Sequence, residues 1–212
     1  MTEMLEKIKQ IGIIPVVVLD DAKDALPIGK ALLEGGLPCA EVTFRTAAAK
    51  ECIKILSEAY PDLLVGAGTV LTPAQVDDAI EAGAKFIVSP GTNPKTIQYC
   101  KEKGIEILPG TTNPSDIEQA LENGVTTVKF FPAEAAGGLK MIKAMSAPYV
   151  DVTFMPTGGI TADNVRDYLK FNKIIACVGS WMVPKNLVAE GKFDEITRLV
   201  KEASEIVKEV RG

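Results

Sequence analysis

Short apolar runs rich in β-branched residues alternate along the chain with longer segments in which apolar residues recur every three or four positions. The runs are almost continuously apolar, as expected of parallel strands that are covered on both faces. They predict eight strands, at residues 13–19, 40–45, 63–67, 86–89, 106–108, 127–131, 152–155 and 174–178. The other segments carry charges between their apolar positions and predict helices with one buried face, at residues 21–34, 47–59, 73–82, 96–103, 114–122 and 162–171.

Strands that alternate with helices in this way favour either a closed barrel or a large doubly wound sheet. The glycine fingerprint of a dinucleotide site does not follow the first strand, and the chain has no linker or low-complexity stretch. The opening residues 1–10 have helical spacing and mixed charge. We therefore predict an α/β fold: a single-domain (β/α)8 TIM barrel over residues 1–212 with an N-terminal helix. In such barrels the functional residues lie at the carboxyl ends of the strands.

Composition and charge argue against several classes of protein. Apolar residues make up 47% of the 212 residues, and the net charge is -5 with both signs spread along the chain. These values fit a folded domain and give no basic patch for a nucleic acid. The N-terminus lacks the basic and apolar regions of a signal peptide, and the apolar stretch at residues 11–19 is too short to span a bilayer. We expect a soluble cytoplasmic protein without nucleic-acid or membrane partners.

The absence of histidine narrows the chemistry further. It removes serine–histidine and cysteine–histidine catalysis, histidine general bases and histidine-held metal sites together. Any acid–base chemistry then depends on Glu, Asp, Lys, Tyr or Cys. The four cysteines, Cys39, Cys52, Cys100 and Cys177, form no C-x-x-C pair and are expected to be buried, reduced thiols.

Lys129 is the most informative polar residue, because it lies inside the apolar strand predicted at residues 127–131. Side chains alternate across a strand, so Thr127, Lys129 and Phe131 share one face. If that face lines the barrel interior, loss of water disfavours the ammonium form, and a neutral amine is a nucleophile for a ketone. The structural alternative is a lysine that reaches solvent from a short or edge strand.

Glu41 shares its predicted strand face with Thr43 and Arg45. A carboxylate inside a barrel is costly unless it is paired or useful, and without histidine Glu41 is the best candidate for a general base. A buried ion pair with Arg45 or Lys129 is the structural alternative. Arg45 lies at the mouth of the strand, where it either clamps a substrate carboxylate through two hydrogen bonds or is an ordinary surface residue.

Glycines follow almost every predicted strand, and two glycine-rich ends are of special interest. Gly158 and Gly159 follow the seventh strand, and Gly179 and Ser180 follow the eighth. In barrels these two loops often bind a phosphate through backbone N–H groups and a short extra helix, which residues 180–183 would begin. Tight turns without a ligand are the alternative.

Five blocks of sequence, taken together and in this order, resemble the bacterial 2-keto-3-deoxy-6-phosphogluconate (KDPG) aldolases, some of which also act on 4-hydroxy-2-oxoglutarate (KHG). The resemblance extends over nearly the whole chain. The blocks are EVTFRT at residues 41–46, VGAGTV at 65–70, SPG at 89–91, KFFPAE at 129–134 and PTGGI at 156–160.

The resemblance implies a role for each site residue. Lys129 is expected to form a Schiff base and Glu41 to transfer protons. The expected substrate contacts are Arg45 and Thr69 at the keto-acid end, Pro90 and Phe131 along the pocket, and Thr157, Gly158, Gly159, Gly179 and Ser180 at the phosphate. Family members typically need no metal or cofactor and are homotrimers. Some relatives have an arginine after the first strand and lack Arg45; here that strand ends in Leu19-Asp20-Asp21, so we expect Arg45 alone to bind the carboxylate.

The implied activity is that of a class I aldolase, which cleaves a phosphorylated keto acid into pyruvate and glyceraldehyde 3-phosphate, as in the Entner–Doudoroff pathway. One alternative is an aldolase of the same mechanism that prefers 4-hydroxy-2-oxoglutarate or a C4 epimer. Another is a non-catalytic phosphosugar-binding barrel, because fold alone does not fix function. Lys129 and Glu41 argue against the last alternative, since a binding protein has no need of a buried amine.

Overall fold

A computed structural model of the chain describes residues 2–212, and Met1, which belongs to the predicted N-terminal helix, lies outside the described residues. All paired strands run parallel, in a six-stranded sheet of order β5-β4-β3-β2-β1-β9 and a three-stranded sheet of order β6-β7-β8. The strands are β1 Ile13–Val17, β2 Cys39–Thr43, β3 Leu64–Gly68, β4 Phe86–Val88, β5 Glu106–Leu108, β6 Gly110–Thr111, β7 Thr127–Phe130, β8 Thr153–Pro156 and β9 Cys177–Gly179.

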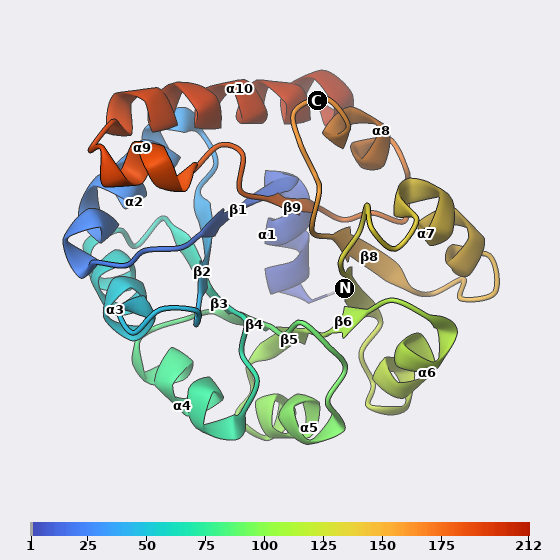
Figure 1. Cartoon of the computed structure of the whole chain (residues 1–212). Coiled ribbons are helices and arrows are strands. Elements are labelled where there is room, and N and C mark those ends of the chain that lie inside the picture. Colours follow the sequence, from blue (N-terminus) through green and yellow to red (C-terminus); the bar gives the residue numbers. More distant parts are fainter. Residues whose placement is uncertain (1) are drawn as a thin grey trace.

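Most of the helices lie outside the strands and surround them (Figure 1). The longest, α10, packs against α2 and α8. Among residues 2–212, no helix combines the length and the apolar character needed to cross a membrane. The helices are α1 Glu3–Ile11, the short 3-10 turn η1 Ala22–Asp24, α2 Ala25–Gly35, α3 Ala49–Ala59, α4 Pro73–Glu81, α5 Pro94–Glu102, α6 Pro114–Glu122, α7 Gly138–Ser146, α8 Val165–Leu169, α9 Lys185–Ala189 and α10 Phe193–Arg211.

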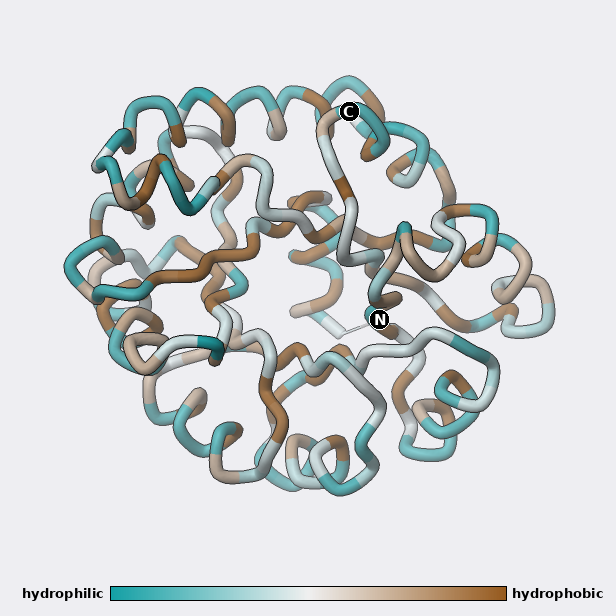
Figure 2. The backbone as a smooth tube through the Cα atoms, viewed as in Figure 1, coloured by the Kyte–Doolittle hydropathy of each residue, from teal (hydrophilic) through white to brown (hydrophobic). Residues whose placement is uncertain are grey.

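Apolar side chains fill two layers, one between the strands and the helices and one on the concave inner face of the strands. Strand β1 contributes to both layers: Ile13 and Val17 belong to the outer layer, and Ile14 and Val16 belong to the inner layer. This alternation is what a parallel strand covered on both faces requires. Figure 2 shows hydrophobic stretches along the strands and hydrophilic stretches on the outer turns of the helices.

Helix α1 covers the amino ends of the strands. Leu5 and Ile8 belong to the same apolar cluster as Ile14 and Cys39, which lie near the starts of β1 and β2. Figure 1 shows α1 within the circle of strands rather than in the outer layer. The carboxyl ends of the strands are therefore the end at which a site can form, as in other α/β folds of this kind.

Three helices begin at an Asn or Thr that is followed by proline. Thr72 and Asn113 each accept a hydrogen bond from a backbone N–H group of the first helical turn of α4 and α6, as residues of these types do when they cap a helix. Asn93 caps α5 in the same way, so this helix begins at Pro94 and not at residue 96 as predicted. These caps fix the points at which the loops after β3, β4 and β6 end.

The structure confirms an α/β fold with a curved parallel sheet and differs from the prediction in several places. Pro109 separates β5 from an additional strand, β6, because proline has no N–H group to donate to the ladder. Helix α8 is shorter than the predicted residues 162–171, and α7, α9 and α10 were not among the predicted helices. Parallel bridges from Phe154 to Ile174 and from Thr157 to Val178 connect β8 with the segment of β9.

Candidate active site

Lys129 on β7 and Glu41 on β2 meet on the inner face, although the two strands belong to different sheets. The Nζ atom of Lys129 lies 3.7 Å from Oε1 of Glu41, and the two side chains are only 7% and 1% exposed. In a surface pair such as Lys7–Glu3, by contrast, both side chains are more than half exposed. A buried ion pair is costly to desolvate and is weak evidence for stability, so this pair calls for a functional explanation.

The second carboxylate oxygen of Glu41, Oε2, is buried and has no hydrogen-bond partner among residues 2–212. A buried acceptor without a donor costs about 1–3 kcal/mol, and such groups are rare in folded proteins. Oε2 is therefore free to accept a proton or a hydrogen bond from a ligand. A general base requires this arrangement.

Gly68 at the end of β3 makes room for the carboxylate of Glu41. A Cβ atom on Gly68 would contact Oε1 of Glu41 and would lie 2.7 Å from its Cγ and 2.9 Å from its Cδ, which is closer than real Cβ atoms come. Strand pairing aligns Gly68 with Thr43, beside Glu41 on the neighbouring strand. Gly68 was not among the predicted site residues, although two glycines on one face of a strand, in Gly66-Ala67-Gly68, are a readable signal of close approach.

The surroundings of Lys129 agree with a position inside the sheet rather than at its edge. Strand β7 lies between β6 and β8 and is therefore not an edge strand. The alternative of a lysine that reaches solvent from an edge strand is wrong. Val128 and Phe130, on either side of Lys129, belong to the outer apolar layer, which leaves Lys129 on the inner face as predicted. The ring of Phe131 lies 5.1 Å from Nζ, measured to its centroid, and limits the access of water to the amine.

Arg45 and Thr69, predicted at the keto-acid end, lie just after the carboxyl ends of β2 and β3. Arg45 is exposed, and its Nε donates a 3.2 Å hydrogen bond to Oγ1 of Thr43, which leaves the rest of the guanidinium to face solvent or a ligand. Thr69 is partly buried and has a φ of 58°, in the left-handed region that a β-branched residue rarely adopts. Such strain persists only where the surroundings enforce it, and it is concentrated at functional sites.

Pro90 and Phe131, predicted to line the pocket, are both partly buried and follow β4 and β7. Pro90 lies against Gly110 at the start of β6, because a Cβ atom on Gly110 would contact the carbonyl oxygen of Pro90. A hollow of about 290 Å³ lies beside it and is lined in part by Val70 and Leu71. The peptide bond between Phe131 and Pro132 is cis.

The residues predicted at the phosphate end come together where β8 and β9 end. Thr157 is buried and pairs with Val178 in an isolated parallel bridge, which brings the two loops side by side. Gly158 and Gly159 have φ values of 99° and 78°, so both positions require glycine.

The last two residues predicted at the phosphate, Gly179 and Ser180, close the end of β9. Gly179 is buried and Ser180 is exposed. A Cβ atom on Gly179 would contact the ring of Trp181, so this position is also reserved for glycine. The short helix predicted to begin at residues 180–183 starts later in the chain, because these residues form a turn closed by a 3.1 Å hydrogen bond from the N–H of Val183 to the carbonyl of Ser180. Pro184 follows, and helix α9 begins only at Lys185.

The cysteines offer no alternative nucleophile. All four are free and buried, and burial raises the pKa of Cys100 and of Cys177 to about 12. The reactive form of cysteine is the thiolate, which these thiols do not form near neutral pH. Among residues 2–212, moreover, no three Cys, Asp or Glu side chains gather into an arrangement that would hold a metal ion.

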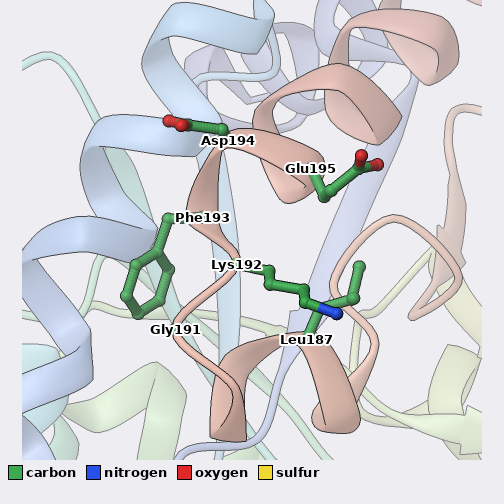
Figure 3. Close-up of a pocket in the computed structure, with 6 residues that line it drawn as sticks. All are labelled: Leu187, Gly191, Lys192, Phe193, Asp194 and Glu195. Atoms are coloured by element: carbon green, nitrogen blue, oxygen red, sulfur yellow. The ribbon is translucent and has the colours of Figure 1, made fainter.

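A larger hollow, of about 560 Å³, lies between the end of α9 and the start of α10 (Figure 3). It is lined by Leu187 and residues 191–195, none of which belongs to the predicted site. Figure 3 shows the charged side chains of Lys192, Asp194 and Glu195 pointing in different directions rather than converging. The size of a hollow alone does not identify an active site. The buried pair of Lys129 and Glu41, by contrast, places an amine next to a carboxylate.

Comparisons with known proteins identify the family of this chain. The family described as KDPG and KHG aldolase matches residues 4–199. The chain belongs to the KDPG and KHG aldolase family. A 2-dehydro-3-deoxy-phosphogluconate aldolase of Haemophilus influenzae is 50% identical over 206 residues, which are 97% of each chain.

Two solved aldolase structures of the family have nearly the same fold as this chain. KDPG aldolase of Legionella pneumophila, with pyruvate captured as a covalent carbinolamine intermediate, has a TM-score of 0.91 at 38% identity and covers 94% of this chain and 97% of its own. The 2-keto-3-deoxy-6-phosphogluconate aldolase of Zymomonas mobilis, with 3-phosphoglycerate, has a TM-score of 0.89 at 41% identity and covers 95% of each chain. The predicted resemblance is thus confirmed at the level of the family.

Proposed function

We propose that this protein is a class I aldolase that cleaves 2-keto-3-deoxy-6-phosphogluconate into pyruvate and glyceraldehyde 3-phosphate. The observation that carries the proposal is the buried pair of Lys129 and Glu41, with one oxygen of Glu41 left without a partner at the carboxyl ends of the strands. A member of this family that brings an amine and a carboxylate together in this way has both the nucleophile and the base that the reaction needs.

The first step is attack of the Lys129 amine on the C2 ketone of the substrate. The N–C2 bond forms as the ketone oxygen takes up a proton, which gives a carbinolamine; loss of that oxygen as water then gives an iminium ion. The pyruvate carbinolamine of the Legionella relative supports this order of events. Phe131 and the buried inner face limit water around the intermediate, which strengthens its electrostatic interaction with Glu41.

The second step breaks the carbon chain. Glu41, directly or through a water, removes the proton of the C4 hydroxyl; the C3–C4 bond breaks, and its electron pair moves to the iminium to form an enamine. Glyceraldehyde 3-phosphate leaves with C4 as its aldehyde carbon. Protonation of the enamine at C3 regenerates an iminium, and addition of one water releases pyruvate and the free amine. Oε2 of Glu41 is the acceptor that this proton transfer requires.

The two ends of the substrate require different contacts. We place the carboxylate at Arg45, beside Thr69, because the part of the Arg45 guanidinium that does not bind Thr43 is suited to a two-pronged hydrogen bond. The chain between the two ends passes Pro90 and Phe131. The phosphate is assigned to Thr157, Gly158, Gly159, Gly179 and Ser180, and the 3-phosphoglycerate of the Zymomonas relative supports a site for a phosphorylated three-carbon acid in this family.

The proposal extends to the whole chain and its assembly. The parallel bridges between β8 and the segment of β9 support a reading in which the two sheets close into one (β/α)8 barrel and residues 1–212 form one domain. In the proposed mechanism Lys129 is the nucleophile and Glu41 is the base, and neither a metal nor a cofactor takes part. From the family we further propose a homotrimer in the cytoplasm.

The family also supports a second candidate, an aldolase with the same mechanism that prefers 4-hydroxy-2-oxoglutarate or a C4 epimer, because its description covers both activities. Pyruvate release from each substrate, followed by coupled oxidation of NADH, distinguishes the candidates. We expect the higher kcat/KM with the phosphorylated acid and a loss of about a thousandfold or more in Lys129→Met. Lys140→Met, a change at an exposed lysine on α7, should leave the rate unchanged. Turnover of the phosphorylated acid by Lys129→Met at the wild-type rate would overturn the proposal.

A further inference from the structure

The loop that follows Lys129 is attached to the glycine turn at the proposed phosphate end. The N–H of Ala133 donates a 2.8 Å hydrogen bond to the carbonyl of Thr157, and the N–H of Glu134 donates a 3.1 Å bond to the carbonyl of Gly158. These two bonds continue the pairing of β7 with β8 beyond the ends of both strands. Any shift of the loop therefore moves the glycine turn with it.

The side chain of Glu134 packs against the glycine turn. A Cβ atom on Gly159 would lie 2.7 Å from both Cβ and Cγ of Glu134, so the glycine backbone rests directly on the aliphatic part of this side chain. Gly159 also has a φ of 78°, which only glycine adopts without strain. The orientation of the Glu134 side chain thus sets the position of the turn.

Tyr168 on α8 fixes that orientation from the outer layer. Its side chain is buried, with 2% exposure, and its hydroxyl donates a hydrogen bond to Oε1 of Glu134. Gly138 leaves the space for this contact, because a Cβ atom there would lie 2.9 Å from Oε1 of Glu134 and 3.0 Å from the hydroxyl of Tyr168. Burial first, and the Glu134 carboxylate second, raise the pKa of Tyr168, so the phenol remains a donor throughout the working pH range.

We infer that Tyr168 is a positioning residue that acts through Glu134 to hold the glycine turn in the shape that binds the substrate phosphate. The inference rests on the proposed function. The hydrogen bond draws the carboxylate toward α8 and satisfies its charge there, so that its negative charge is not free to approach the bound phosphate. Tyr168 itself does not touch the substrate, and the chemistry at Lys129 does not depend on it.

Tyr168→Phe tests the inference, since it removes only the hydroxyl. KM should rise about tenfold or more for the phosphorylated acid, the effect of losing one hydrogen bond to a charged group. For 4-hydroxy-2-oxoglutarate, which has no phosphate, KM should change less than twofold, and kcat should be unchanged for both substrates. Tyr149→Phe is the matched control, because Tyr149 donates a 2.9 Å bond to Glu118 outside the site, and its KM should be that of the wild type.

A second pair of variants keeps the test valid if Tyr168→Phe does not fold. Glu134 is largely exposed, so its substitution spares the core. Glu134→Gln retains an oxygen that accepts from Tyr168 and should keep a near-normal KM, whereas Glu134→Ala should raise KM for the phosphorylated acid alone. Equal effects on both substrates, or no effect in Tyr168→Phe and Glu134→Ala, would contradict the inference. If the wild-type enzyme had the same KM for both substrates, this result would instead contradict the proposed phosphate site, and the inference with it.

Discussion

The contact between Gly68 and Glu41 gives a sharp prediction for Gly68→Ala. The new methyl carbon would lie 2.7 Å from Cγ of Glu41, and ordinary carbon contacts require about 3.5 Å or more. Glu41 therefore has to move by about 0.8 Å, or the two strands have to separate. Because Glu41 is 1% exposed and packed among inner-face residues, it moves within the site and changes its distance from Lys129.

A misplacement of about 1 Å in a catalytic group typically costs about a hundredfold in rate, so kcat of Gly68→Ala should fall by about that factor. Overpacking costs about 1–3 kcal/mol, which a less flexible unfolded chain offsets by about 0.4–1 kcal/mol. The unfolding free energy should thus fall by about 1–2 kcal/mol, and the variant should remain folded. Steady-state kinetics and urea unfolding measure the two effects separately.

Gly66→Ala is the matched control for this prediction. Gly66 lies on the same face of β3, and a Cβ atom there would meet the ring of Phe86 instead of the carboxylate. We expect a comparable loss of stability but a kcat within about threefold of the wild type. A Gly68→Ala enzyme with near-normal kcat, or a Gly66→Ala enzyme that is equally impaired, would refute the view that Gly68 acts by positioning Glu41.

Three further predictions concern stability. Thr69→Gly relieves the strained φ of 58°. It should raise the unfolding free energy by about 1 kcal/mol while the activity falls. A lower stability of this variant in thermal unfolding would contradict the prediction. Arg211→Lys loses hydrogen bonds to the carbonyls of Leu169, Ile174 and Ile175. Its unfolding free energy, measured in urea, should therefore fall by about 2 kcal/mol with kcat unchanged. An unaltered urea midpoint would refute a stabilising role for Arg211. Burial raises the pKa of Cys100 from 9.0 to about 12, so its contribution to stability is complete below pH 9 and is lost as the pH rises toward 12. Urea midpoints from about pH 8 to 10.5 should fall less steeply in Cys100→Ala, and equal slopes would show the reasoning to be wrong.

The alternation of apolar and polar residues located the strands other than β6 and indicated which residues share a face with Lys129. A buried parallel strand tolerates little besides β-branched and apolar residues, so a lysine within one is conspicuous, and period two then assigns its face. The missed start of α5 was readable, because Asn93-Pro94 repeats the capping residue and proline found at the starts of α4 and α6. Helix α10 was also readable, because Ile196, Val200 and Val207 recur at helical spacing.

Other features depend on contacts that no local pattern contains. The distance between Glu41 and Lys129 follows from how two separate sheets curve toward each other, and the sequence had left an ion pair with Arg45 equally open. The break at Pro109 was visible, but the added strand after it exists through its pairing with β7, which no local pattern predicts. A left-handed threonine at position 69 runs against residue preference, and only the surrounding structure enforces it.

Reductive trapping tests whether Lys129 forms a covalent bond with the keto acid. The protein would be incubated with pyruvate and sodium borohydride and digested, and the modified peptide located by mass spectrometry, with Lys129→Met and Lys140→Met treated in parallel. We expect a reduced pyruvyl adduct on Lys129 in the wild type and in Lys140→Met, and none in Lys129→Met. An adduct on another lysine, or none on folded wild-type protein while a known Schiff-base aldolase is labelled, would contradict it.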